Sequence, residues 1–493
     1  MENISNYLSE EREQQWRIEI RTKMKTKERT LIERTKMNEA EPNVRNRDSQ
    51  EVNKGLSMDQ ALTESQRCID CPNPTCITGC PVGINIPKFI KKIEIKDILG
   101  AAQVLKETNT LPAVCGRVCP QEKQCEAQCF YTLKLKKEPV AIGYLERFAA
   151  DFEQQSGKMS IPEVAKPNQI KVAAIGSGPA SLAWASDMAR LGYEVTVFEA
   201  LHEIGGVLKY GIPEFRLPNS VVDIEIENMR KMGVNFITNF IVGKTASFED
   251  LREKGYKAFF VGSGAGLPRF MNIPGENFIG VFSSNEYLTR VNLMNAANPD
   301  FDTPVISGKN VAVIGGGNTA MDAVRTAKRL GAENARIIYR RSINEMPARI
   351  EEIKHAQEEG IEFLNLNNPL EYYADENGRV KSMKLQKMEL GEPDSSGRRS
   401  PVPVEGSEYI IDADTVVVSV GVSPNPLIPA SLKDLKVSKW GTIIVNEETM
   451  QSSIPDIFAG GDIVRGGATV ILAMGDGRRA AAGMHNYLSN LNS

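Results

Sequence analysis

The sequence predicts an α/β protein in which a helical, cysteine-rich domain precedes two Rossmann-like dinucleotide-binding domains. All eight cysteines lie between residues 68 and 129, where the apolar residues show no strand-like alternation. Two later segments, which begin near residues 171 and 310, each predict an apolar strand, a glycine-rich turn, a helix and a second strand. The length of 493 residues allows roughly two to four domains of ordinary size.

Residues 1–40 are dense in Glu, Lys and Arg, and their apolar side chains, such as Trp16, Ile18 and Ile20, are loosely spaced. We expect a charged helical extension, with a solvated face favoured over a partner-binding site. The start of the chain has no apolar signal segment, and no apolar run reaches the roughly 18 residues that a membrane helix needs. A formal charge of −4 without a basic stripe argues against nucleic acid as the main partner.

The cysteines form two groups, C-x2-C-x4-C-x3-C-P and C-x3-C-x5-C-x3-C, which comprise Cys68, Cys71, Cys76 and Cys80, and Cys115, Cys119, Cys125 and Cys129. Such short spacings allow a few turns of backbone to direct several thiolates at one iron–sulfur cluster, and two [4Fe-4S] clusters would use nearly every cysteine. Disulfide frameworks belong to small secreted domains, so that alternative is disfavoured. Zinc is also disfavoured, because only one C-x2-C is present and the three histidines lie far from the cysteines in sequence. Reduced thiols and labile clusters predict a cytoplasmic protein.

The stretch 156–169 carries turn-forming residues and predicts the connection to the first dinucleotide unit. In that unit Gly176 and Gly178 occupy the first two positions of G-x-G-x-x-G, which lets backbone N–H groups approach a pyrophosphate at the helix N-terminus. Ser181 replaces the third glycine and is small enough for helix and strand to pack. Glu199 ends the second strand, where an acid accepts hydrogen bonds from ribose hydroxyls.

The second unit repeats the turn with Gly315, Gly317 and Ala320, but its second strand ends in Arg340 and Arg341. An acid at this position repels a 2′-phosphate, whereas guanidinium groups bind it through paired hydrogen bonds. The unit should therefore prefer NADP(H) to NAD(H). Two arginines that are merely solvated at a strand end remain the alternative.

The last block of the chain predicts a further strand that ends in residues 459–462 and is followed by glycines and a helix. This arrangement brings the Asp462 carboxylate and a helix N-terminus to one place, which suits the ribitol chain and pyrimidine edge of a flavin.

Taken in order, the motifs GSGPA…VFEA, GGGNTAMDA…YRRS and FAGGD resemble those of flavoprotein reductases that have two dinucleotide-binding domains. With the cysteine block and the segments EIGGVLKYGIPEFRLP and VGSGAGLPRFMNIPGENFIGVFSSNEYL, the chain is similar to the small (β) subunit of glutamate synthase. It also resembles the N-terminal part of dihydropyrimidine dehydrogenase and the large subunit of NADH-dependent ferredoxin:NADP oxidoreductase. The resemblance covers about residue 41 to the end; it is specific for the superfamily and much less so for the member.

The resemblance implies that the NADP domain is inserted into the FAD domain. The expected parts are a charged helical extension (1–40), a helical domain binding two [4Fe-4S] clusters (41–165), the FAD-binding domain in two parts (166–305 and 420–493), and the NADP-binding domain (306–419). The expected FAD-binding residues are Gly176, Gly178, Pro179, Ala180, Ser181, Glu199, Gly206, Val207, Arg216, Gly461, Asp462, Thr469 and Val470. The expected NADP-binding residues are Gly315, Gly317, Asn318, Thr319, Ala320, Arg340 and Arg341.

For the clusters, the resemblance implies interleaved ligands in place of four plus four. One cluster would be held by Cys68, Cys71, Cys76 and Cys129, and the other by Cys80, Cys119, Cys125 and Glu146. Cys115 would then be a spare thiol. A carboxylate is a harder ligand than a thiolate and should alter the potential of the second cluster.

The resemblance further implies that NADPH reduces FAD and that single electrons then pass through the clusters to a partner subunit. In glutamate synthase this partner is a large FMN-containing subunit that makes glutamate from 2-oxoglutarate and glutamine. The alternative is a ferredoxin:NADP (bifurcating) or sulfide/polysulfide oxidoreductase, whose partner would be a small iron–sulfur flavoprotein subunit. A non-enzymatic interaction protein is a minor third possibility. Since cofactors carry this chemistry, no catalytic side chain is expected, and no Ser-His-Asp or Cys-His arrangement stands out.

Overall fold

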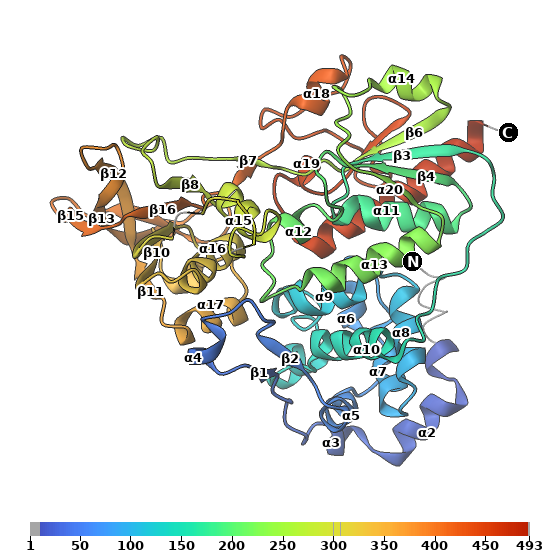
Figure 1. The fold of residues 1–493 in the computed structure, drawn as a ribbon. Coiled ribbons are helices and arrows are strands. Elements are labelled where there is room, and N and C mark those ends of the chain that lie inside the picture. The colour runs from blue at the N-terminus through green and yellow to red at the C-terminus, as the bar shows by residue number, and fades with distance from the viewer. Residues whose placement is uncertain (1–9, 299, 306, 492–493) are drawn as a thin grey trace.

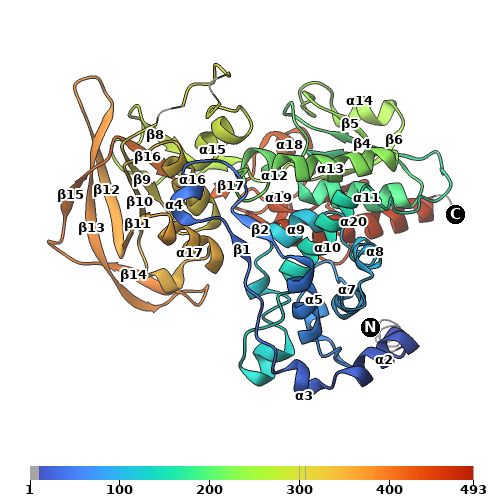
Figure 2. The same cartoon turned by 60° about the horizontal axis from the view of Figure 1, so that its bottom comes forward.

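The computed structural model describes residues 10–298, 300–305 and 307–491. Residues 1–9 of the predicted extension, residue 306 at the predicted start of the NADP-binding domain, and residues 492–493 lie outside the described part. The cysteine-rich helices, blue to teal in Figure 1, lie beneath a first parallel sheet, and a second sheet in yellow and orange lies to one side (Figures 1 and 2). This arrangement confirms the predicted fold class.

The cysteine-rich domain is built from short helices that pack around an apolar centre. Its elements are α5 (Met58–Arg67), α6 (Thr75–Thr78), α7 (Ile86–Glu94), α8 (Ile98–Lys106), α9 (Pro112–Val118), η1 (Gln121–Lys123), η2 (Tyr131–Leu135) and α10 (Ile142–Ser156). Ser57 caps α5 through a capping box with Gln60, and Asn85 and Asp97 accept from the first-turn N–H groups of α7 and α8. These caps fix where each helix begins, and therefore how the cysteine-bearing loops between them run.

The first sheet has the parallel order β18-β6-β3-β4-β5. Its strands are β3 (Lys171–Ile175), β4 (Glu194–Phe198), β5 (Asn235–Ile237), β6 (Tyr256–Val261) and β18 (Ile457–Ala459), and its helices include α11 (Pro179–Arg190), α12 (Val207–Tyr210), α13 (Asn219–Lys231), α14 (Phe248–Glu253), α18 (Leu427–Ser431), α19 (Asp462–Arg465) and α20 (Val470–Leu491). After its first residue β3 is buried throughout, as expected for a parallel strand covered on both faces. Because β18 near the C-terminus completes a sheet that begins with β3, the second sheet is an insertion.

The second sheet has the parallel order β11-β10-β9-β16-β8. It consists of β8 (Val281–Ser283), β9 (Asn310–Ile314), β10 (Asn334–Tyr339), β11 (Glu362–Asn365) and β16 (Thr415–Val418), with α15 (Ser284–Asn292), α16 (Asn318–Arg329), η3 (Ile343–Glu345) and α17 (Ile350–Glu358). An antiparallel sheet of β12 (Asn367–Ala374), β13 (Val380–Pro393), β14 (Arg399–Pro403) and β15 (Tyr409–Asp412) shares an apolar core with it.

The two chain crossings between the sheets, β7 (Leu267–Pro268) and β17 (Val422–Ser423), pair antiparallel with each other. The second sheet already includes β8, which lies before the expected domain start at residue 306. A strand of three residues is too short to show a period in the sequence, so this sheet edge could not be placed from the pattern.

The N-terminal segment packs against the body of the protein. Its helices α2 (Gln15–Lys23) and α3 (Thr26–Arg29) place Arg17 against Asp70 and Arg29 against Glu94, and both arginines are buried. The expectation of a solvated face is therefore wrong for these side chains. The ion-paired residues are arginines, so hydrophobic periodicity could not reveal these contacts.

Beyond these helices, β1 (Asn38–Glu39), α4 (Pro42–Arg45) and β2 (Asn53–Gly55) extend to the second sheet, where α4 lies near α17 (Figure 1). Arg45 is 2% exposed. Its Nε lies 3.0 Å from Glu359, a carboxylate that also pairs with Arg325 of α16. Burial opposes ionisation of Glu359, but hydrogen bonds and charge from Arg325 and Arg329 lower its pKa to about 2.

A second buried pair joins the two dinucleotide-binding parts. Arg216, in the loop after α12, lies 2.7 Å from Asp322 of α16 and 3.0 Å from Glu352 of α17.

Among the described residues, no helix combines the length and apolar character needed to cross a bilayer.

The buried position of Arg45 predicts a stability effect. Arg45→Met removes the hydrogen bonds to the buried carboxylate of Glu359 and to Glu358. Hydrogen bonds to charged groups contribute about 2 kcal/mol each in typical proteins, so thermal unfolding should begin at a lower temperature. The matched change Arg47→Met, at an exposed position two residues away, should leave the unfolding curve unchanged. Equal curves for both variants, measured by calorimetry, would contradict the role of this contact.

Candidate functional site

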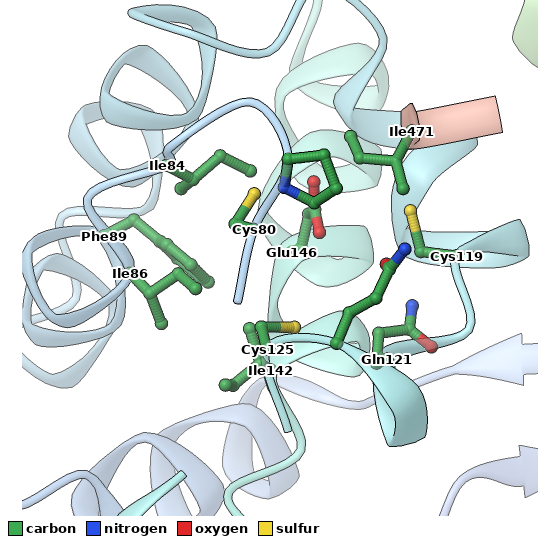
Figure 3. A pocket seen from close by; sticks show the side chains of 12 residues that line it. Cys80, Ile84, Ile86, Phe89, Cys119, Gln121, Cys125, Ile142, Glu146 and Ile471 are labelled. Carbon is green, nitrogen blue, oxygen red and sulfur yellow. The ribbon is translucent and has the colours of Figure 1, made fainter. Parts of the chain in front are cut away.

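Two pockets in the cysteine-rich domain collect the predicted cluster residues. The inner pocket contains Cys80, Cys119, Cys125 and Glu146, whose side chains surround the same space (Figure 3). The outer pocket contains Cys68, Cys71, Cys76 and Cys129. Cys80 of the first motif thus lies with the second group, and Cys129 of the second motif with the first. The structure groups these residues as the resemblance implied, while their role as ligands stays a prediction.

The two pockets are adjacent. Ile86 and Ile142 line both of them, so the pockets share an apolar wall. Ile471, in the first turn of α20, lines only the inner pocket, which connects that pocket to the first dinucleotide-binding part. The outer pocket is bounded by the loop at Cys71 and by α6, which carries Cys76; both cysteines are only partly buried.

All eight cysteines are free of disulfides. Burial raises the pKa of Cys76 and Cys125 well above the ordinary thiol value; neighbouring thiols act in the same direction on both, and carboxylates do so on Cys125. Without a cation these thiols therefore stay protonated, whereas iron would offset the cost of several buried thiolates. The donor set fits an iron–sulfur cluster: grouped sulfurs, an apolar surround and no competing lysine among the pocket residues.

Glu146 of α10 is 5% exposed, and burial raises its pKa to about 8. Its Oε1 accepts a hydrogen bond of 2.7 Å from Asn109 Nδ2. Asn109 Oδ1 in turn accepts from the Leu111 N–H at 3.0 Å, which fixes the orientation of the amide. Asn109 therefore positions the carboxylate in the inner pocket. The sequence gives no signal for this role, because a single asparagine forms no motif.

Cys115 lines neither pocket. Its Sγ lies 3.6 Å from Asn109 Oδ1 and 3.6 Å from the Met474 sulfur, within the packing between α9 and α20. This placement agrees with the expected spare thiol.

The first glycine turn has positions that only glycine satisfies. Gly176 has φ +92°, and a Cβ there would lie 2.8 Å from the Gly262 carbonyl oxygen. Gly178 differs, because its φ is −67° and a Cβ would meet nothing nearer than 3.9 Å. The protein itself does not require glycine at 178, whereas the close approach of a pyrophosphate does.

The second turn repeats this distinction. Gly315 has φ +141° with the Ser419 carbonyl oxygen only 2.3 Å from an added Cβ, while at Gly317 no atom lies within 4 Å. Gly317 precedes α16, and Asn318, Thr319 and Ala320 form its first turn. Both turns thus leave an open cradle at a helix N-terminus, which fits a dinucleotide phosphate.

Several predicted flavin residues already have partners within the chain. Glu199 accepts hydrogen bonds from the N–H and Oγ of Ser177, at 2.8 and 2.6 Å. Asp462 accepts from the Ala468 N–H at 2.9 Å. The guanidinium of Arg216 is held by carboxylates of the second domain. For Arg216 in particular, the charge acts between domains, and its flavin contact stays a prediction.

The remaining predicted flavin residues lie at the starts of helices. Gly206 has φ +55°, and a Cβ there would lie 2.9 Å from the Gly178 Cα, so the loop before α12 contacts the glycine turn. The other positions are Pro179, Ala180 and Ser181 in α11, Val207 in α12, Gly461 before α19, and Thr469 and Val470 at the start of α20.

The two arginines after β10 differ in their surroundings. Arg341 is buried, and its guanidinium binds Asp394 and donates to the Arg399 carbonyl oxygen. Arg340 is exposed, and within the described part of the chain its side chain has no hydrogen bond or ion pair. Arg340 is therefore the guanidinium available to a nucleotide phosphate.

Grouped cysteines beside two dinucleotide-binding turns define a nicotinamide-dependent oxidoreductase of the iron–sulfur flavoprotein class. Residues 45–158 match the family model of dihydropyrimidine dehydrogenase domain II, 4Fe-4S cluster, and residues 170–477 match that of pyridine nucleotide-disulphide oxidoreductase. The glutamate synthase [NADPH] small chain of Escherichia coli (strain K12) is 39% identical, with 89% of this chain and 93% of that one covered. The chain belongs to the glutamate synthase small-subunit family.

Other similarities are broader. The putative oxidoreductase AegA of Escherichia coli (strain K12) is also 39% identical over 87% of this chain, which spans 66% of that protein. The structure of FprA of Mycobacterium tuberculosis in complex with NADPH has a TM-score of 0.56 and 20% identity, with 66% of this chain and 86% of that one covered. This last likeness concerns the fold.

The position of Cys115 predicts that its loss is harmless to the metal centres. Cys115→Ser should leave the iron content per chain unchanged, because this thiol lines neither pocket. Cys119→Ser, one helical turn further along and inside the inner pocket, should lower the iron content. Iron analysis of both variants, purified under argon, checks the assignment; loss of iron from the Cys115 variant would overturn it.

The different surroundings of the two arginines predict different roles. Arg340→Ala should raise the KM for NADPH roughly 10- to 100-fold, the equivalent of about 1.5–3 kcal/mol for hydrogen bonds to a charged group, and leave the KM for NADH unchanged. Arg336→Ala, on strand β10 just before Arg340 and paired with Glu362, is the control and should change neither KM. If Arg340→Ala affects both nucleotides equally, its role in phosphate selection is wrong.

Proposed function

We propose that the chain is the NADPH-oxidising electron-input subunit of a cytoplasmic glutamate synthase. The observation that carries this proposal is the adjacency of the two cysteine pockets to each other and, through Ile471, to the start of α20. Thr469 and Val470, immediately before Ile471, are predicted flavin contacts. The arrangement provides a continuous route from a nucleotide site to a partly exposed cysteine loop.

The residues present suit two [4Fe-4S] clusters. The proposed ligands of the outer cluster are Cys68, Cys71, Cys76 and Cys129; those of the inner cluster are Cys80, Cys119, Cys125 and Glu146. Asn109 orients Glu146 through its 2.7 Å hydrogen bond. Ile86 and Ile142 form a shared apolar wall between the two pockets.

The proposed nucleotide sites use the two glycine turns. The first turn, with Glu199 and Asp462, would hold FAD, and the second turn, with Arg340, would hold NADP(H). When bound, these groups supply the conversion of a two-electron donor into single electrons. The protein itself binds and orients these cofactors. The open cradles at Gly178 and Gly317 leave room for the phosphates, and the ion pair from Arg216 to Asp322 holds the two nucleotide domains together.

In this proposal a separate subunit completes the reaction. The relatives in this family include small chains of glutamate synthase. A large FMN-containing subunit would then bind 2-oxoglutarate and glutamine. A ferredoxin:NADP or sulfide/polysulfide oxidoreductase with a small iron–sulfur flavoprotein partner is the second candidate, because AegA, named only as an oxidoreductase, is equally similar in sequence.

Purification of the chain from its native cell under argon distinguishes these functions. We expect NADPH to reduce the bound flavin, and mass spectrometry to identify a large amidotransferase-like partner in the same fractions, together with FAD and iron. Removal of iron by a chelator should abolish electron delivery to the partner and leave flavin reduction by NADPH intact. A small iron–sulfur flavoprotein as the only partner would instead support the second candidate, and absence of flavin and iron would refute both.

A further inference from the structure

Residues 347–350 lie between the second glycine turn and the inner pocket. On one side this segment is hydrogen-bonded to the turn itself. The Ala348 N–H donates to the Gly316 carbonyl oxygen at 3.2 Å, and the Arg349 N–H donates to Asn318 Oδ1 at 2.8 Å. Asn318 is the first residue of α16 and one of the predicted nucleotide contacts.

The other side of the segment binds the loop that carries the inner-pocket cysteines. The Arg349 guanidinium donates to the Arg117 carbonyl oxygen at 2.7 Å and to Gln121 Oε1 at 3.0 Å. Gln121 lines the inner pocket, between Cys119 and Cys125 in sequence (Figure 3).

Two further contacts reinforce this side. Lys123 Nζ donates to the Pro347 carbonyl oxygen at 2.8 Å, and the Ile350 N–H donates to Glu122 Oε1 at 3.3 Å. The cysteine loop and the segment are thus joined through both backbone and side chains.

Arg349 is the residue that connects both sides, and its charge is buried. The residue is 4% exposed, and the carboxylate partners of its guanidinium are Glu351 at 3.0 Å and Glu122 at 3.8 Å. Buried charges are weakly screened, so a change of charge on either side of the segment acts on this guanidinium strongly. Arg349 thus bonds the pocket-lining Gln121 through its guanidinium and the nucleotide turn, at Asn318, through its backbone N–H.

We propose that the 347–350 segment couples nucleotide binding to the redox potential of the inner-pocket cluster, with Arg349 as the positioning residue. The inference rests on the proposed function, because it needs a nucleotide at the second turn and a cluster in the inner pocket. Both the nucleotide phosphates and a reduced cluster add negative charge to the two sides of one segment. Each therefore opposes the other, and by linkage the two effects are equal in size.

The coupling has a direct consequence for turnover. An electron that reaches the inner pocket weakens the hold of the second turn on oxidised nucleotide. Because NADP+ and NADPH carry the same phosphates, the effect weakens the binding of both nucleotides, and release of the NADP+ product is thereby favoured.

The test is a redox titration of the iron-loaded holoprotein, followed by electron paramagnetic resonance, with and without saturating NADP+. We expect NADP+ to lower the midpoint potential of the inner-pocket cluster and to leave that of the outer-pocket cluster unchanged. The expected size is at least a threefold change in nucleotide affinity, which corresponds to about 28 mV at 59 mV per tenfold for one electron. Asn109→Ala identifies the inner cluster, since it perturbs the signal of the centre next to Glu146.

Two variants and a control complete the experiment. Arg349→Gln should abolish the NADP+-dependent shift while iron, flavin and nucleotide binding are retained. Arg349→Lys keeps the charge but not the paired hydrogen bonds, and should retain only part of the shift. Lys354→Met, an exposed position on α17, should behave as the unmodified protein.

The outcomes separate this inference from the proposed function. Absence of iron, flavin or NADP+ binding in the unmodified protein refutes the proposed function, and this inference with it. If all three are present and NADP+ leaves the inner-pocket potential unchanged, only the coupling is refuted. A full shift in Arg349→Gln also refutes it. Should that variant lose its iron, the unmodified protein and Arg349→Lys decide the question.

Discussion

The structure depends on the close packing of α20 against the cysteine-rich domain. This helix is glycine-rich where it meets its neighbours: a Cβ at Gly475 would lie 2.9 Å from the Pro81 carbonyl oxygen, and one at Gly477 only 2.1 Å from that of Ala180. Because the helix has no side chains at these points, its first turn reaches the inner pocket through Ile471. Proposed flavin contacts and a proposed cluster site are therefore neighbours on one rigid element.

Buried ion pairs join the second dinucleotide domain to the rest. Three arginines make these contacts: Arg45 in the N-terminal part of the chain, Arg216 in the first dinucleotide-binding part and Arg349 in the second. Each of them is at most 9% exposed. A buried ion is costly unless it is paired with good geometry, so such contacts favour one relative placement of domains over alternatives. In a protein that must align a nucleotide with a flavin, a defined placement is useful even where the pairs add little net stability.

Much of the local structure was predictable from the sequence. The glycine turns at Gly176 and Gly315 follow apolar strands at the expected positions, and the parallel sheets formed around them. The fold class and the family were also evident, since spacing and residue type carry that information directly. Less predictable were features made by charged residues, such as the burial of Arg17 and Arg29, because periodicity methods treat arginine as a surface residue.

Sequence alone determined which chemistry the chain is equipped for: eight cysteines at short spacings, and two glycine turns with different residues after their second strands. Tertiary structure decided how those parts meet. It divided seven of the cysteines between the two pockets and left Cys115 outside both. It paired Arg341 with Asp394 and left Arg340 accessible. It also placed Arg349 between the second glycine turn and the inner pocket. The physical reason is that a motif is a property of neighbouring residues, whereas these contacts join residues far apart in the chain, whose approach is set by the packing of whole helices and sheets.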